Sequence, residues 1–574
     1  MTSYFVGDEK HQTPPYPGLL HLVNICLHTM TTISLFYLLN TIKVTRPKSS
    51  TTIEINGIPI SIAFVTAMLF AVHPIHTEAI CGGVGQAELA CTFFMTIGLL
   101  FYLKCDTSPK FQCLTFLSAI LAASSKEQGF LFLPICFLYE IITTLGTAKF
   151  NVKKLTILIG TTLVLGAIRI YYFGRPKSAL FLFFDNKAAF EPSPTRELTF
   201  FYLPFKYFYL TIFPVGLCAD WGDGAIPVVQ NFIDSRLIIP VYTVGFMLFK
   251  IKKTINFQTW TINDKAFYIA ISIYASTFLP SSNLLGAVGF VIAERVFYAP
   301  SIGFFILVAI GFNRIIEKYS KFSQIFKNIF IFTCIGLSLR TVGRTWDWES
   351  DMKLSYAGLR VVDTNARIFV NVGAYIRETS SDCHRALAYF DIAVKLNPKM
   401  AKAHFNRARC FRFLIEQRQN EVNAIKQGKK LKPAKGDAPL KTLAKQSSLS
   451  LRHCMAISKF SIAGNGFAPN HVVECFLDHV NLITALGDIF LGKMAHTPEV
   501  ATLALQTIDK AEQLRPDFPR VFVTKANLFL AMHQFKEAKT ALKKAWSMDQ
   551  RNLDVLRAVS VFFLFFFTTL IMSK

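Results

Sequence analysis

The chain has 574 residues, of which 52% are hydrophobic and only 17% are charged. Soluble domains carry about 25% charged residues, so we expect lipid to be the solvent for much of this chain. The net charge is +24, but the Lys and Arg residues stand between apolar runs rather than on one soluble domain. This placement argues against nucleic-acid binding and agrees with the positive-inside rule for membrane proteins.

Apolar runs long enough to cross a bilayer need roughly 17–25 residues. The clear candidates are residues 19–42, 58–73, 88–103, 129–147, 155–173, 266–284 and 325–343, and shorter ones are 112–124, 237–250 and 298–312. If all ten cross, Lys and Arg concentrate in alternate connections, for example at Lys250, Lys252 and Lys253. The basic connections are then cytoplasmic, and both chain ends are predicted to be lumenal.

Residues 199–217 are apolar and aromatic but contain Pro204 and Pro214. A crossing here would move the Lys250 cluster to the lumen, so we interpret the segment as broken, and as re-entrant or interfacial. A plain crossing beside a wrongly divided neighbour is the alternative.

A helical repeat begins after about Arg344. Ala386, Phe390, Ala393 and Pro398 match the small, aromatic, small and Pro positions of the tetratricopeptide (TPR) template, and Gly373 and Ala374 precede them at the expected distance. The same frame recurs 34 residues apart, from Ala504 to Ala538 and from Ala511 to Ala545, with further matches at Pro516, Ala526 and Phe529. Such a repeat lets antiparallel helices pack closely and stack on one another.

The predicted class is therefore all-α, with a polytopic membrane domain followed by a TPR solenoid. The membrane domain is placed at 19–343 after a polar stretch at 1–18, and the repeats at 344–415 and 451–558. Between them, 416–450 is a Lys-rich insertion or linker, for which phosphate or lipid binding is the alternative. Residues 559–574 form an apolar tail that interrupts the repeat, either an alternative end or a short membrane anchor. The scattered Cys residues give no sign of a zinc site or a disulfide framework.

Polar residues that interrupt apolar runs are candidate site residues. His73, His76 and Glu78 close the second run, and Glu88 follows at the start of the third. The two His residues can share one face of a turn, with Glu78 the nearest third ligand for a metal. A polar helix-end cap is the alternative.

Four further polar segments face the predicted lumen. Lys126 and Glu127 lie between two apolar segments, where they can also simply mark a loop. Arg295 can grip a phosphate by its bidentate fork, although an ion pair with Glu294 is the alternative. The loops holding Arg196 and Asp220 add polar groups, and Asp220, like Asp223 beside it, is a candidate base for an acceptor hydroxyl.

These motifs together resemble the transmembrane and TPR-repeat-containing protein O-mannosyltransferases. The resemblance rests on HPIHTEA, SKEQG, PSPTREL followed by LTFFYL, LCADW and LPSSNLLGAVGFVIAERVFYAPS in this order, with the repeats behind them. It covers most of residues 16–400 and the C-terminal repeats. It implies a C-type glycosyltransferase membrane fold in the endoplasmic reticulum. Such an enzyme takes mannose from dolichyl-phosphate-mannose and places it on Ser or Thr of proteins, here cadherin-type domains.

The resemblance also has departures. Family members usually begin with one more helix and a lumenal loop that bears the acidic residue taken as catalytic base. Here Met1 falls just before the second family helix, so we expect residues 1–18 to be a remnant of that loop, with Asp8 and Glu9 its only acids. Gln86 stands where the family has Arg.

The resulting hypothesis is an endoplasmic-reticulum mannosyltransferase with lumenal repeats. Glu78 and Glu88 would be the catalytic acids, and Arg295, His73, His76 and Lys126 would hold the donor phosphate. Glu294, Glu127, Asp220 and Arg196 are the other lumenal candidates. We expect no metal or cofactor besides the lipid-linked donor, and a protein acceptor or client on the repeats. The rivals are a non-catalytic adaptor whose lumenal repeats bind a client or chaperone and, third, a transporter.

Overall fold

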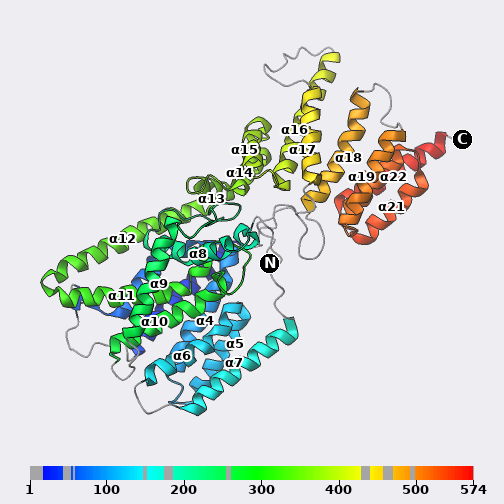
Figure 1. Ribbon diagram of the computed structural model, residues 1–574. Helices are drawn as coiled ribbons and strands as arrows, with labels where there is room; N and C mark the ends of the chain where they lie inside the picture. Colours follow the sequence, from blue (N-terminus) through cyan, green and yellow to red (C-terminus); the bar gives the residue numbers. More distant parts are fainter. Residues whose placement is uncertain are drawn as a thin grey trace. The chain divides into compact units, whose positions relative to one another are not determined.

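The computed structural model describes residues 17–42, 53–55, 58–145, 151–173, 185–253, 260–427, 440–456, 470–490 and 498–572. The predicted N-terminal remnant lies almost wholly outside these residues, and so do Asp8 and Glu9. The chain divides into two compact units, the first ending at Asp363 and the second running on from Thr364. Figure 1 shows both as helical. The predicted all-α class is confirmed, apart from a short antiparallel hairpin of β1 (Ile53–Ile55) and β2 (Ile58–Ile60) in which Ile53 pairs with Ile60.

The first unit contains a helix at each of the ten predicted crossings. These helices are α1 (Pro17–Thr41), α2 (Ile62–Val72), α4 (Gln86–Tyr102), α5 (Pro109–Ser125), α6 (Phe132–Thr144), α7 (Val152–Phe173), α9 (Ile238–Lys253), α10 (Ile262–Phe278), α11 (Pro300–Lys318) and α12 (Ser323–Asp347). The other α-helices described in this unit are α3 (Thr77–Cys81), α8 (Thr195–Ile212) and α13 (Asp351–Leu359).

Within the described residues, five helices are long and apolar enough to span a bilayer: α1, the helix ending at Tyr102, α7, α11 and α12. A sixth span results if α2 and the segment Pro74–Cys81, which meet at a bend of 52°, cross as one. Pro74 lacks the N–H that a continuous helix would need, which explains a bend at this position. The total of ten crossings stays a prediction.

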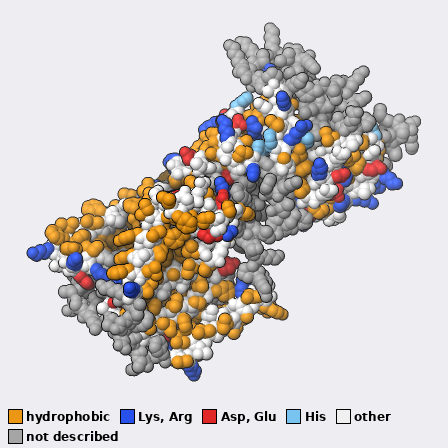
Figure 2. Space-filling view, in the orientation of Figure 1, with side chains coloured by type: hydrophobic (Ala, Val, Ile, Leu, Met, Phe, Trp, Pro, Cys, Tyr) orange, Lys and Arg blue, Asp and Glu red, His pale blue; other side chains and the backbone are white. Residues whose placement is uncertain are grey.

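The core of this unit lies where α1, α2, α4, α6, α10 and α11 meet, around side chains such as Leu35, Phe70 and Phe132. The helices α7, α9 and α12 instead expose apolar faces, with Leu163, Tyr242 and others more than half exposed. Figure 2 shows hydrophobic side chains gathered over the outer faces of these helices. Apolar outer faces on helices that satisfy their own backbone hydrogen bonds suit contact with lipid.

One predicted interruption is absent. The helix α8 continues through Pro204 and ends at Ile212, before Pro214, so the interpretation of 199–217 as broken at Pro204 was wrong. The helix faces tertiary partners along its length, because Leu203, Tyr207 and Leu210 are buried.

The second unit is a row of antiparallel helix pairs. Its helices are α14 (Ala366–Ser380), α15 (Cys383–Leu396), α16 (Ala401–Lys426), α17 (Leu440–Ala456), α18 (Asn470–Phe490), α19 (Pro498–Leu514), α20 (Pro519–Ala531), α21 (Phe535–Met548) and α22 (Leu553–Met572). Three of the small residues used for the repeat frame, Ala386, Ala504 and Ala538, are fully buried. Packing at small residues is what lets such pairs approach and stack.

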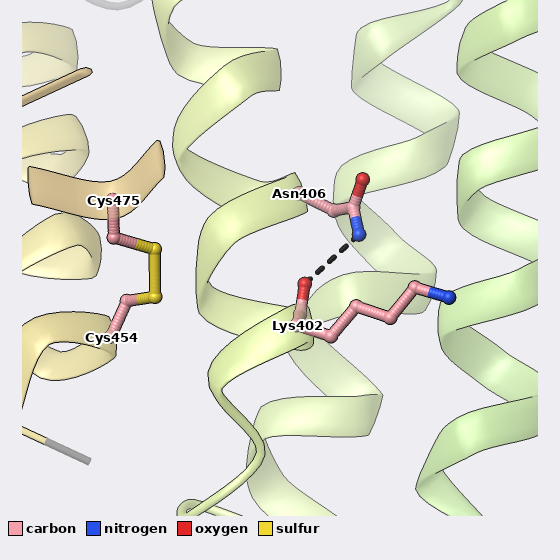
Figure 3. Close-up of a disulfide and its surroundings, with 4 residues drawn as sticks. All are labelled: Lys402, Asn406, Cys454 and Cys475. Carbon is pink, nitrogen blue, oxygen red and sulfur yellow. Dashed lines mark hydrogen bonds between the residues drawn. A yellow bond between two sulfur atoms is a disulfide. The ribbon is translucent and has the colours of Figure 1, made fainter. Parts of the chain in front are cut away.

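Two sequence interpretations of this unit need revision. The helix α22 begins at Leu553, ahead of the predicted tail, and packs on α20 and α21 with Ala558 and Phe562 buried, so it continues the array. A disulfide joins Cys454 of α17 to Cys475 of α18 (Figure 3), a pairing that no pattern in the sequence indicated. The Lys-rich insertion is helical at both ends, and its centre at 428–439 lies outside the described residues.

Candidate functional site

Four charged side chains from distant parts of the first unit form one ionic network. Arg295 Nη1 pairs with Glu78 Oε1, and its backbone N–H donates to Glu78 Oε2 at 3.1 Å. Arg295 Nε lies 3.6 Å from Glu88 Oε1, and the same oxygen accepts from Lys126 Nζ at 2.5 Å. The two carboxylates are 4–5% exposed, whereas Arg295 and Lys126 are 26% and 18% exposed. The cations are therefore the members that an incoming ligand can reach.

Short local elements set these four positions. Glu78 lies in the first turn of α3 and Glu88 in the first turn of α4, where the helix N-terminus favours negative charge. Between them, Gly85 packs so closely on Ala79 that an added Cβ would lie 2.1 Å from the Ala79 carbonyl oxygen. Lys126 ends α5, and Arg295 sits in a short 3₁₀ helix, Glu294–Phe297.

The two predicted histidines lie beside this network but are used in packing. His73 Nε2 contacts the Thr211 carbonyl at 2.9 Å, and its Nδ1 accepts from the Ile75 N–H. His76 contacts the Phe70 carbonyl and the Ser301 hydroxyl, both at 2.9 Å. Both rings are buried with both nitrogens engaged. This arrangement leaves neither ring nitrogen directed at a phosphate.

Glu294 points away from its neighbour Arg295. Its Oε1 accepts from the Cys218 N–H at 2.7 Å and from Trp221 Nε1 at 3.1 Å, while its Oε2 is buried without a hydrogen-bond partner. Burial raises the pKa of the Glu294 carboxyl to about 8, and the nearby Arg344 guanidinium opposes this shift. The alternative of a Glu294–Arg295 ion pair was therefore wrong. Successive side chains in a 3₁₀ helix are about 120° apart, which separates them.

The remaining candidates have partners outside the network. Asp220 accepts from the Gly222 N–H at 2.9 Å in the turn that carries Trp221. Glu127 is 77% exposed and lies 3.9 Å from Arg169, and Arg196 pairs with its exposed neighbour Glu197. Among the described residues, no three His, Cys, Asp or Glu side chains are placed to hold a metal ion.

Sequence reasoning missed the residues that support this site. The Tyr207 hydroxyl accepts from the Ala293 N–H at 2.9 Å and donates to the Ala293 carbonyl at 3.2 Å, which fixes the backbone just before Glu294. Asn186 Nδ2 donates to Asn283 Oδ1 at 2.8 Å and to the Val288 carbonyl at 2.9 Å. A local sequence pattern could not reveal these contacts, because the bonded residues lie 86 to 102 positions apart in the chain.

The structure defines a multi-spanning membrane protein with a buried ionic network and a second unit of TPR-type helix pairs. A family profile described as Protein O-mannosyl-transferase TMTC, DUF1736, matches residues 174–248. Protein O-mannosyl-transferase TMTC3 of Mus musculus is 32% identical over 523 residues, covering 86% of this chain and 52% of that protein. Tmtc3 of Drosophila melanogaster is 32% identical over 440 residues, covering 68% and 46%. The chain belongs to the TMTC family.

The chain spans about half the length of the curated relatives it matches. Among solved structures, a TPR protein of Thermus thermophilus matches 39% of this chain and 94% of its own, at 16% identity and a TM-score of 0.27.

Proposed function

We propose that this chain takes part in transfer of mannose from dolichyl-phosphate-mannose to Ser or Thr hydroxyls of proteins in the endoplasmic reticulum lumen. The observation that carries the proposal is the ionic network of Arg295, Glu78, Glu88 and Lys126. It combines partly exposed cations with buried carboxylates at the ends of helices in a membrane unit. The names of the relatives, protein O-mannosyl-transferases, support the same reaction.

The network has the groups that this reaction needs. The bond from sugar C1 to the donor phosphate breaks and a bond from C1 to the acceptor oxygen forms, so charge develops on the phosphate and a proton must leave the hydroxyl. Arg295 and Lys126 can stabilise the phosphate, because charged donors in a dry site strongly favour a developing anion. Glu78 or Glu88 can take the proton.

Arg295 links these two roles. In the structure, it is neutralised by Glu78 and Glu88. A donor phosphate competes with Glu78 for the guanidinium, and the carboxylate that it displaces becomes free to accept the hydroxyl proton. Binding of the donor phosphate would thereby generate the free carboxylate that acts as the base.

A disulfide in the second unit supports placement of the repeats in the lumen of the endoplasmic reticulum. The disulfide between Cys454 and Cys475 is of the kind that forms and persists in oxidising compartments such as the endoplasmic reticulum lumen. A lumenal solenoid would be available to dock a protein acceptor, for which cadherin-type domains are the proposed class.

The test measures mannose transfer from dolichyl-phosphate-mannose to a cadherin-domain acceptor in microsomes that express the chain. Arg295→Ala and Glu78→Ala are expected to lower the rate by roughly 10²–10³-fold. Lys353→Ala is the matched control, since Lys353 forms an exposed ion pair with Glu349, with both side chains at least half exposed. Equal rates in wild type and both network variants would overturn the assignment.

A non-catalytic adaptor is the second candidate. One observation favours it: both cations of the network are already paired with carboxylates, as in a purely structural network. For an adaptor, the wild-type chain would show no transfer in this assay but would still capture the acceptor domain.

A further inference from the structure

A pair of cysteines in the second unit has no role in the proposed transfer. Cys383 is the first residue of α15 and Cys410 lies in α16, 27 residues further along the chain. In the structure both are free thiols in hydrogen-bonding contact with each other, and both are buried, at 2% and 0% exposure. We propose that Cys383 and Cys410 form a second disulfide, which links α15 to α16 across the boundary of two repeats.

The surrounding contacts keep the two thiols next to each other. Arg377, near the end of α14, donates from Nη1 to Asn406 Oδ1 at 2.6 Å. Asn406 lies one helical turn before Cys410 on α16, so both residues are on one face of that helix. The chain then turns at Ser381, which has a left-handed backbone, and the Cys383 N–H donates to the Ser381 carbonyl at 2.9 Å. The turn therefore delivers Cys383 to the face that carries Cys410.

The disulfide already present supplies a precedent in the same unit. Cys454 and Cys475 also lie on consecutive helices, α17 and α18, at a separation of 21 residues. Both are completely buried and nevertheless bonded. Burial in the finished fold is thus compatible with oxidation, which takes place while the chain folds.

The pKa shifts of the two thiols indicate which of them reacts first with an oxidant. The hydrogen bond from Cys410 lowers the pKa of Cys383, burial opposes the shift, and Arg377 adds to it. The same hydrogen bond raises the pKa of Cys410. Because the thiolate is the nucleophile, Cys383 attacks first in a partly folded chain in which α15 and α16 have already made these contacts.

The oxidant is a disulfide, either of a thiol oxidoreductase or of oxidised glutathione. The Cys383 thiolate attacks one sulfur of that disulfide, forms a mixed disulfide and releases one thiolate. Cys410 then loses its proton and attacks the Cys383 sulfur, releasing the second thiolate. The two cysteines lose two electrons and two protons, and the oxidant becomes two thiols.

Peptide mapping of the full chain from microsomes tests the proposal directly. Free thiols are blocked with N-ethylmaleimide, and the unreduced protein is digested with trypsin. Cleavage after Arg and Lys places the four cysteines on four peptides: 378–385, 410–412, 453–459 and 460–493. We expect peptide 378–385 to be recovered in covalent linkage with 410–412, alongside the linked pair 453–459 and 460–493.

A second readout uses partial digestion. Exposed Lys399 lies between Cys383 and Cys410, so cleavage there leaves two fragments that the new disulfide holds together on a gel until reductant is added. Cys410→Ser is expected to release the fragments without reductant.

The outcomes distinguish this disulfide from the proposed function. Alkylated Cys383 and Cys410 beside an intact Cys454–Cys475 link would overturn the second disulfide and leave the mannosyltransferase proposal standing. Reduced thiols at all four positions would overturn both the second disulfide and the lumenal placement of the repeats.

Discussion

Replacing Arg295 with alanine removes the residue that joins the two carboxylates of the network. Glu88 keeps Lys126 at 2.5 Å, so it stays compensated. Glu78, at 4% exposure, keeps only the backbone N–H at position 295. The variant thus leaves one buried carboxylate without a cation, a change that costs about 3–5 kcal/mol.

This loss should lower the thermal midpoint of the first unit by roughly 5–15 °C, given the usual dependence of Tm on stability in large domains. Lys126→Met should cost less, about 1.5–3 kcal/mol, because Arg295 Nε remains 3.6 Å from Glu88. The double variant Glu78→Gln with Arg295→Met should regain at least half of the loss, since no buried charge is left alone.

The assay is thermal unfolding of the detergent-solubilised full chain. Unfolding is monitored by the reaction of a thiol dye with Cys91 and Cys136, which are buried in the first unit. An unchanged midpoint for Arg295→Ala, or a double variant as unstable as the single one, would refute the pairing described here.

Three further changes address the repeats. His479 is buried with neither ring nitrogen hydrogen-bonded, and burial lowers its pKa from 6.5 to about 4. The imidazole of His479 binds a proton in the unfolded chain but not in the folded one, so the contribution of His479 to stability is complete above about pH 6.5 and falls as the pH drops toward 4. Hydrogen exchange of α18 peptides should show this loss of stability at low pH, and His479→Phe should make the exchange less dependent on pH. Gly373→Ala should destabilise the second unit by about 1–3 kcal/mol, because an added Cβ would lie 2.6 Å from the Phe390 ring. Gly336→Ala in the first unit is the control: its Cβ would meet open space, so this variant should be neutral or stabilising in the same thermal assay. Cys454→Ser should cost about 2–4 kcal/mol by removing a cross-link of α17 to α18, and the confirming result would be a denaturation midpoint below that of oxidised wild type and equal to that of oxidised Cys475→Ser.

Much of the fold followed from patterns that are local in sequence. Apolar runs mark helices because a membrane segment must satisfy its backbone internally, and a helix occurs at each of the ten runs. The spacing of small residues identified the repeats for a similar reason, since Ala386 and Ala393 lie on the buried face of a single helix. The same reasoning wrongly predicted a break at Pro204. The missing N–H of a proline weakens a helix, but the buried packing of Leu203 and Tyr207 keeps α8 helical there.

The candidate site was predictable in its residues but not in its contacts. Glu78, Glu88, Lys126 and Arg295 were all singled out, because ionisable groups beside apolar runs are costly unless paired. Their pairing depends on tertiary structure, since Glu78 and Arg295 are 217 residues apart. Because Glu294 and Arg295 are neighbours in the sequence, an ion pair between them was one of the predictions. In the structure the 3₁₀ helix directs their side chains apart.

The balance of charge in the network bears on how a donor could bind. Two carboxylates and two cations sum to zero, so the buried centre as it stands is neutral. A phosphate that entered without any other change would leave net negative charge in a region of low dielectric, which is strongly unfavourable. In the transfer proposed above, the acceptor hydroxyl would release one proton, and uptake of that proton by Glu78 or Glu88 would relieve the excess. Under this proposal, the carboxylate that gives up Arg295 to the phosphate would also receive that proton, so binding of the donor would be coupled to activation of the acceptor.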